Sequence, residues 1–126
     1  MVELRDVSKR FGTFEALKCA NFEIKAGEFM TFLGPSGCGK TTLLSAIAGT
    51  MGVDSGEIEV LGNPLHRMRG GALTRFRAKN IGFIFQQFNL IPTLTVAENV
   101  GIPLLIQGVS SGKALTRSRE ILEKVG

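Results

Sequence analysis

Nine consecutive residues of this 126-residue chain, GPSGCGKTT at positions 34–42, are suited to holding an anion. The glycines let the main chain bring several N–H groups to one point. Lys40 adds an ammonium group, and Thr41 and Thr42 add hydroxyls. The spacing Gly34-x-x-x-x-Gly39-Lys40-Thr41 fits the pattern G-x-x-x-x-G-K-[ST] of a phosphate-binding loop. These residues therefore predict a site for the triphosphate of a nucleotide.

Each part of this loop has an expected role toward a nucleoside triphosphate and Mg²⁺. Lys40 is expected to contact the β- and γ-phosphates, the Thr41 hydroxyl to ligate Mg²⁺, and Thr42 to reach the α-phosphate side. A helix starting near Lys40 would point its open N–H groups and positive dipole end at the same anion. The predicted nucleotide-binding residues of the loop are Gly34, Pro35, Ser36, Gly37, Cys38, Gly39, Lys40, Thr41 and Thr42.

The loop has two other possible interpretations. One is a flexible glycine turn whose lysine is merely solvated. The other is a dinucleotide-binding turn, but glycines at 34, 37 and 39 do not have the spacing G-x-G-x-x-G. For Cys38, the alternatives are a small spacer and a thiol made reactive by the helix N-terminus.

The flanking segments predict a strand, the loop and then a helix. The apolar run Phe29–Leu33 is expected to be a buried strand that ends at the loop, and Lys40–Ala48 an amphipathic helix. Ile81–Phe85 is expected to be a second buried strand. Val2–Val7 and Asn21–Lys25 alternate between apolar and polar residues, which predicts an antiparallel β layer against a parallel core sheet.

The C-terminal part predicts two helices. Thr95 and Glu98 have the spacing of a capping box that opens a helix, which Pro103 is expected to kink or end. Lys113–Val125 has the apolar spacing of a last amphipathic helix. The expected fold class is therefore α/β, with a parallel sheet flanked by helices, an antiparallel β layer and the start of a helical subdomain.

Composition narrows the function classes. With 44% hydrophobic and 21% charged residues, the chain has the make-up of a soluble globular protein. The formal charge of +4 is spread along the chain, and a loose basic group at residues 67–79 is interpreted as a solvated face, so no nucleic-acid partner is expected. No apolar run approaches the roughly 18–20 residues that cross a bilayer. The charged N-terminus does not resemble a signal peptide, and a cytoplasmic protein is expected.

The chain resembles the ATP-binding cassette (ABC) transporter ATPases, in particular cassettes of the lipoprotein-release, macrolide-export and cell-division type. The resemblance covers nearly the whole sequence. It rests on LRDVSKRF at 4–11, GEF at 27–29, GPSGCGKTT at 34–42, SGEI at 55–58, IGFIFQQFNL at 81–90 and LTVAENV at 94–100. It implies a P-loop NTPase core and the cofactors ATP and Mg²⁺.

The resemblance also assigns roles outside the loop. Phe11 matches the position where the family stacks an aromatic ring on adenine, although the family usually has tyrosine there; the alternative is a turn or core aromatic. Gln86 matches the Q-loop glutamine, which in the family senses Mg²⁺ and the γ-phosphate and couples the site to the membrane partner. Gln87 is the alternative in the neighbouring register. The implied metal-binding residues are Thr41 and Gln86.

The resemblance implies one partial nucleotide-binding domain, 1–126, with an ATP-binding core to about residue 85 and the Q-loop and start of the helical subdomain at about 86–126. It also implies two partners, a transmembrane permease and a second ATP-binding subunit in a head-to-tail dimer. The expected location is peripheral, on the inner face of the cell membrane through the permease.

Activity is expected to be limited to binding. The family hydrolyses ATP with carboxylates at the end of a buried strand, a signature segment and a switch histidine, and no segment of this sequence matches these. No catalytic residue is therefore assigned, and the chain is expected to bind ATP without hydrolysing it. Two alternatives stay open: a non-catalytic nucleotide-binding remnant, and the ATPase head of a chromosome-maintenance or repair protein.

Overall fold

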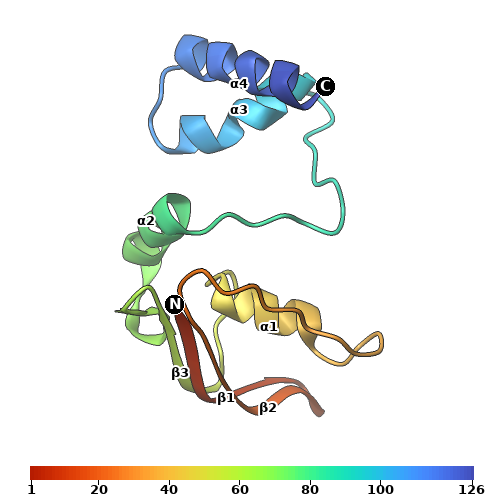
Figure 1. Cartoon of the computed structure of the whole chain (residues 1–126), viewed down its shortest axis with the longest axis vertical. Coiled ribbons are helices and arrows are strands. Elements are labelled where there is room, and N and C mark those ends of the chain that lie inside the picture. Colours follow the sequence, from red (N-terminus) through yellow and green to blue (C-terminus); the bar gives the residue numbers. More distant parts are fainter. The chain divides into compact units, whose positions relative to one another are not determined.

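The computed structural model describes all 126 residues, which form two compact units, Met1–Ile81 and Gly82–Gly126 (Figure 1). The first unit contains every strand, the helices α1 and α2 and the glycine loop. The second unit contains the helices α3 and α4.

The first unit is built on a four-stranded antiparallel sheet with the order β2-β1-β3-β4. The strands are β1 Val2–Phe11, β2 Phe14–Ile24, β3 Ser55–Val60 and β4 Asn63–Pro64. The antiparallel layer predicted from alternation is therefore confirmed, although β1 and β2 are longer than their alternating stretches. They extend until they meet in a tight hairpin at Gly12, which has a φ of 59°.

A bulge in β1 decides which side chains reach the core. Leu4 and Val7 are both fully buried, although residues three apart in a regular strand face opposite sides. Asp6 between them has a φ of 51°, and the pairing with β2 shifts register there. The extra residue turns Val7 back to the side of Leu4.

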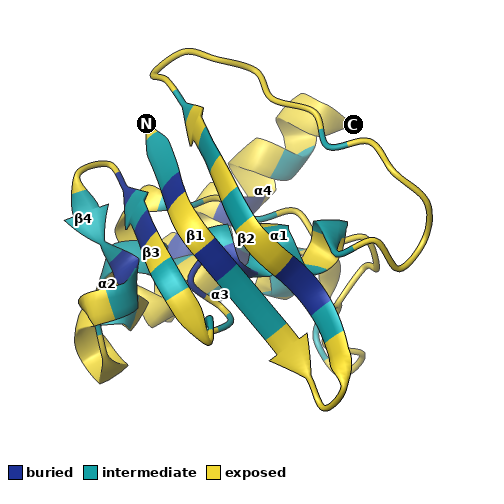
Figure 2. Cartoon of the chain, turned by 90° about the horizontal axis from the view of Figure 1, so that it is seen from below, coloured by how far each residue is buried: buried dark blue, intermediate teal, exposed yellow.

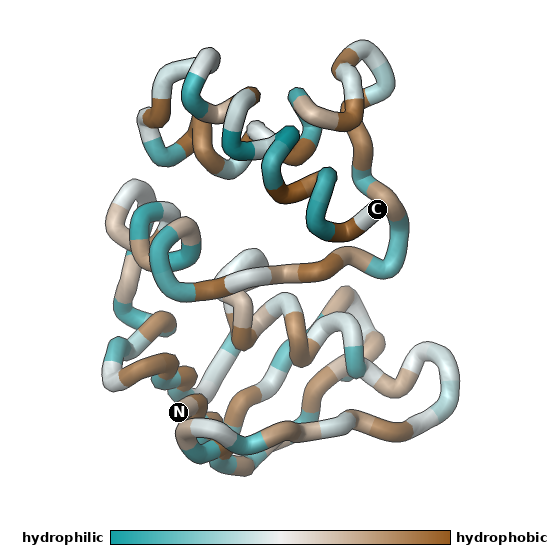
Figure 3. Tube along the Cα trace, turned by 45° about the horizontal axis from the view of Figure 1, so that its top comes forward, coloured by the Kyte–Doolittle hydropathy of each residue, from teal (hydrophilic) through white to brown (hydrophobic).

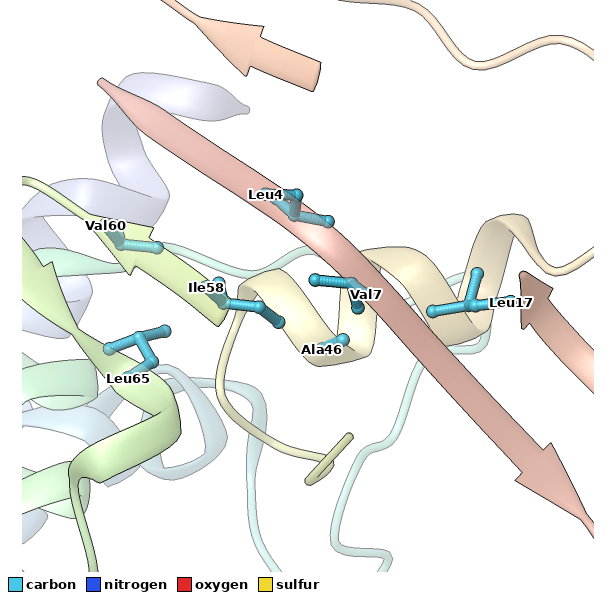
Figure 4. Close-up of a cluster of buried hydrophobic side chains, with 7 residues drawn as sticks. All are labelled: Leu4, Val7, Leu17, Ala46, Ile58, Val60 and Leu65. Carbon is cyan, nitrogen blue, oxygen red and sulfur yellow. The ribbon is translucent and has the colours of Figure 1, made fainter. Parts of the chain in front are cut away.

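The core of the first unit lies between this sheet and the helix α1, Lys40–Ile47. Figure 2 shows the buried positions side by side on β1, β2 and β3, and Figure 4 shows their side chains facing α1. The buried residues of this cluster are Leu4, Val7, Leu17, Ala46, Ile58, Val60 and Leu65. The small side chain of Ala46 lets α1 lie close to the sheet, so the helix that follows the glycine loop is anchored by apolar packing.

The chain leaves the sheet through a short 3₁₀ turn and a polar helix. The turn η1, Leu65–Arg67, buries Leu65 in the core. The helix α2, Gly70–Asn80, has no buried residue, and only Leu73 and Phe76 pack against the core cluster. This segment contains the basic group at residues 67–79, and the absence of buried residues from α2 agrees with its interpretation as a solvated face.

The prediction of two buried strands is wrong for this structure. Phe29–Leu33 and Ile81–Phe85 are assigned to no strand and pair with no other segment. Several of their apolar side chains are exposed, with Phe29 92% and Ile84 97% accessible, whereas Phe32 and Phe83 are half-buried. A parallel strand is stable when neighbours take its N–H and C=O groups on both sides, and these 126 residues supply no such neighbour.

The second unit is a pair of packed helices, α3 Val96–Ile106 and α4 Ser111–Val125. The predicted capping box is confirmed: Glu98 N–H donates to Thr95 Oγ1 at 3.3 Å, and Thr95 N–H donates to Glu98 Oε2 at 2.8 Å. Of the two expected effects of Pro103, ending the helix is wrong, because α3 continues to Ile106, and a kink stays a prediction. Proline removes only one hydrogen bond near the C-terminal end of α3, where few remain to be lost.

The helix α4 confirms the predicted amphipathic helix and begins two residues earlier, at Ser111. Figure 3 shows hydrophilic and hydrophobic residues following one another along this helix, which leads to the C-terminus. It packs on α3 through small residues, since a Cβ at Gly101 would lie 3.2 Å from Ser118 Oγ and 3.8 Å from Ala114 Cβ. None of the helices of this chain is both long and apolar enough to span a membrane.

Candidate nucleotide-binding site

The glycine loop forms a tight turn in front of α1. Cys38 N–H donates to Pro35 O at 3.4 Å, and Gly37 and Gly39 have φ values of 81° and 89°. These left-handed conformations favour glycine, and Gly39 is one of the two glycines that the phosphate-loop pattern requires. Gly34 meets the returning loop, because a Cβ there would lie 2.6 Å from Cys38 Sγ.

The Lys40 ammonium lies inside the loop. Lys40 Nζ donates to Gly34 O at 2.6 Å and to Pro35 O at 2.7 Å, and Cys38 Sγ is 3.3 Å away. The positive group is therefore held by main-chain carbonyls and not by a carboxylate. Such neutral contacts can be exchanged for the oxygens of a phosphate, which interact more strongly with a cation.

The N-terminus of α1 adds open donors next to the ammonium. The first helical hydrogen bond is from Leu43 N–H to Gly39 O at 2.8 Å, so the N–H groups of Lys40, Thr41 and Thr42 precede it. No side chain caps this end, and its first turn carries no acidic residue. Open amides, a helix dipole and an ammonium group together fit an anionic polyphosphate.

The hydroxyls of Thr41 and Thr42 make no hydrogen bond within the chain, and Thr41 is exposed while Thr42 is half-buried. Hydroxyl oxygen is a suitable ligand for Mg²⁺, a hard cation that prefers oxygen. The pair therefore suits a Mg²⁺-bound phosphate chain.

The β1–β2 hairpin fixes the position of Gly39. A Cβ at position 39 would collide with the carbonyl oxygen of Ala16 on β2 and would lie 3.4 Å from Leu17 Cδ2. Two residues before Ala16, Phe14 pairs with Phe11 across the hairpin. The strand that contacts the glycine loop, β2, is therefore also the strand that pairs with the end of β1 at Phe11.

Phe11 is available for stacking. Its ring is at the end of β1 and 48% exposed, and Phe14 opposite is 57% exposed. Lys9 Nζ lies 5.7 Å from the Phe11 ring centroid, within cation–π range. Phe11 is thus a surface aromatic next to the hairpin turn, so the core-aromatic alternative is wrong for this structure and the turn-aromatic alternative stays open.

Gln86 and Gln87 belong to the second unit, where both are exposed at a bend that follows Phe85. The structure thus gathers the glycine loop, α1 and the Phe11 hairpin within the first unit. The shared metal role of Thr41 and Gln86 stays a prediction.

Sequence reasoning missed two residues that shape this site. One is Ala16, whose backbone contact with Gly39 has no signal in side-chain type. The other is Asp54, whose carboxylate binds Lys9 and the Arg10 N–H. Asp54 directly precedes SGEI at 55–58, but the sequence has no signal for its partners, which lie 45 and 44 residues earlier in the chain at the adjacent end of β1.

Comparison with known proteins identifies the class. A family model described as ABC transporter matches residues 17–126. The chain belongs to the ABC transporter family, and its phosphate-loop ATPase fold class is confirmed by two solved cassettes. These are a dimeric post-hydrolysis state of the ATP-binding cassette MJ0796 bound to ADP and Pi, and a dimeric MJ0796 structure. The TM-scores are 0.87 and 0.89 with 39% and 38% identity, over 98% of this chain and 56% of each cassette.

Curated relatives include several ATP-binding proteins of transporters. The lipoprotein-releasing system ATP-binding protein LolD of Bacteroides thetaiotaomicron is 44% identical over the whole chain. The spermidine/putrescine import ATP-binding protein PotA of Nitrosomonas europaea is 45% identical over 99% of the chain. The chain spans 58% of the length of LolD and 33% of that of PotA.

Proposed function

We propose that the glycine loop of this chain binds the triphosphate of ATP together with Mg²⁺. The observation that carries the proposal is the placement of the Lys40 ammonium and the open N–H groups of α1 at one turn. In this arrangement Lys40 contacts the β- and γ-phosphates, Thr41 ligates Mg²⁺, and Thr42 reaches the α-phosphate side. Bound Mg²⁺ would neutralise charge on the phosphates.

Phe11 is proposed as the stacking surface for adenine. Its ring is exposed, and the hairpin that carries it continues into Ala16, which contacts Gly39 of the loop. A phenylalanine supplies the ring face but no hydroxyl, so recognition of the base here depends on stacking. Gln86 is proposed as the second metal-sensing residue on the strength of its match to the family's Q-loop.

We infer that the whole protein is the ATP-binding subunit of an ABC membrane transporter of the export or lipoprotein-release type, in which ATP binding and hydrolysis drive transport. The similarity to LolD supports the transporter type, and the dimeric cassettes support a second ATP-binding subunit. A transmembrane permease would hold the assembly on the inner face of the cell membrane. Residues 1–85 are the proposed ATP-binding core, and residues 86–126 the Q-loop and start of the helical subdomain.

For the 126-residue chain itself, we propose ATP binding without turnover. Its carboxylates lie on the antiparallel strands, in turns and on helices, and none ends a buried strand beside the glycine loop. Water activation and full metal coordination therefore lack their acidic groups. The chain would act as a nucleotide-binding unit.

Calorimetric titration with Mg·ATP and with Mg·tripolyphosphate tests this function. Both ligands should bind, and Lys40→Ala should weaken both by about 10- to 100-fold, because a charge-assisted contact contributes about 1.5–3 kcal/mol. The control Lys18→Ala removes an exposed lysine of β2 and should leave both affinities unchanged. Equal affinities in wild type and Lys40→Ala would refute the site. Phosphate release above background that depends on Lys40 would refute binding without turnover.

A further inference from the structure

The last residues of β1 are supported by a strand on one side only. Pairing with β2 continues through Arg10↔Glu15 to the end of the hairpin, whereas pairing with β3 stops at Ser8↔Ser55. The segment from Lys9 to Phe11 therefore extends past β3. An unsupported strand end that carries a stacking residue would fray, unless another group takes the place of the ladder.

Asp54 takes that place. Its N–H donates to Ser8 O at 2.9 Å, which prolongs the ladder by one residue. Its side chain then accepts two hydrogen bonds, from Arg10 N–H to Oδ2 at 2.7 Å and from Lys9 Nζ to Oδ1 at 2.8 Å. The Lys9 hydrogen bond, followed by that from the Arg10 N–H, lowers the pKa of Asp54 below its usual range.

The close approach of β1 and β3 makes this contact possible. Gly56, two residues after Asp54, has a φ of 88°, and a Cβ there would collide with the carbonyl oxygen of Asp6. The absence of a side chain lets β3 begin directly against β1. Asp54 is thereby brought within reach of the strand end.

Asp54 also sets the surroundings of the Phe11 ring. The ammonium that it holds, Lys9 Nζ, lies 5.7 Å from the ring centroid, and the Lys9 side chain is only 18% exposed. One carboxylate thus fixes both the backbone N–H next to Phe11 and the cation beside its ring. Both carboxylate oxygens accept hydrogen bonds inside the protein, so the effect of Asp54 on a ligand is expected to pass through Lys9 and the Arg10 N–H.

We propose that Asp54 is a positioning residue for base recognition, which clamps Arg10 and Lys9 so that the Phe11 ring is held ready to stack on the base of a bound nucleotide. This inference rests on the proposed nucleotide-binding function. It separates two parts of affinity: the phosphate part, which depends on Lys40 and α1, and the base part, which depends on Asp54 through Phe11. If Asp54 had a purely structural role, replacing it would not distinguish the base part of the affinity from the phosphate part.

The test compares Mg·ATP with Mg·tripolyphosphate, which has the phosphates but no base. Asp54→Ala should weaken ATP about three- to tenfold, as expected for lost charge-assisted contacts that order the stacking residue, and change tripolyphosphate less than about twofold. Asp54→Asn keeps one acceptor for the Arg10 N–H and should give a smaller loss. Hydrogen exchange at the Arg10 and Phe11 amides should become faster in Asp54→Ala. The matched control is Glu57→Gln, another exposed carboxylate of the same region that contacts Arg5, His66 and Arg67 instead.

Each outcome supports or overturns the proposed role of Asp54. Equal losses for both ligands, or no loss for either, in the folded variants would overturn the role of Asp54 and leave the phosphate site intact. If Asp54→Ala does not fold, Asp54→Asn decides by the same comparison. If the wild-type protein binds tripolyphosphate as tightly as ATP, the base adds no affinity. That result would overturn both the proposed base contact and the proposed role of Asp54. Wild-type protein that binds neither ligand would refute the proposed function itself.

Discussion

Gly39 and Ala16 lie so close that no side chain fits between them: a Cβ built on Gly39 collides with the Ala16 carbonyl oxygen. The contact joins the end of the glycine loop to β2 and, through the hairpin, to the strand end that carries Phe11. Gly39 therefore serves two purposes. It provides the left-handed turn into α1, and it allows the loop to rest on the sheet.

Gly39→Ala and Gly37→Ala separate these purposes. Both glycines have positive φ values, so either alanine should cost about 1–2 kcal/mol in backbone strain. Only Gly39→Ala also meets the Ala16 backbone, whereas nothing lies within 4 Å of a Cβ at position 37. Overpacking should add about 1–3 kcal/mol. Chemical denaturation should therefore place Gly39→Ala well below Gly37→Ala in stability, and equal stabilities would contradict the contact.

Phe11→Ala should weaken ATP more than tripolyphosphate, because only ATP has a base to stack. Loss of an aromatic stacking partner should cost about 1–3 kcal/mol of ATP affinity. The matched control is Phe14→Ala, which removes the exposed ring paired opposite Phe11 on β2. Competition titrations with the two ligands measure the difference. A larger effect of Phe14→Ala would move the stacking surface to β2.

The capping box of α3 should make the second unit sensitive to acid. The pKa of Glu98 is lowered from its ordinary value of 4.5, first because the Thr95 hydroxyl donates to the carboxylate and then because the Thr95 N–H does. A carboxyl group with a lowered pKa stabilises the fold above its unfolded pKa, and this contribution is lost as the pH falls through the folded value. Helicity measured against pH should fall below about pH 4.5 in wild type.

Thr95→Ala and Glu98→Gln check the origin of that acid sensitivity. Glu98→Gln cannot ionise, so its α3 helicity should change less with pH over the same range. Thr95→Ala should lower stability by about 1 kcal/mol at pH 7 through loss of the N-cap. An unchanged pH profile in Glu98→Gln would assign the acid transition to other carboxylates.

The exposed apolar segments should cause self-association. Phe29, Ile84 and Phe88 are each more than 90% accessible, and their segments carry unpaired backbone groups. Apolar extended segments of this kind pair readily with other chains. Light scattering should rise with protein concentration, and Ile84→Lys should reduce it. Lys79→Glu, a charge change on the exposed face of α2, serves as a control and should have little effect.

Residue types and their spacing predict those parts of this protein that depend on neighbours in the chain. The loop and α1 follow from glycines, Lys40 and apolar positions within fifteen residues, and the Thr95–Glu98 box follows from a spacing of three. Turn geometry, capping and helix periodicity are local properties, so residue types at fixed offsets are sufficient to predict them.

The contacts that join distant segments depend on the folded structure and have no signal in the sequence. The bulge at Asp6 brings Leu4 and Val7 to one face, the Ala16 carbonyl touches Gly39, and Asp54 clamps a strand end 44 residues away at Arg10. The same dependence explains the error at Phe29–Leu33 and Ile81–Phe85, whose apolar composition suits a buried strand. A strand forms when another segment takes its backbone hydrogen bonds, and that partner is a property of the folded chain and not of the segment.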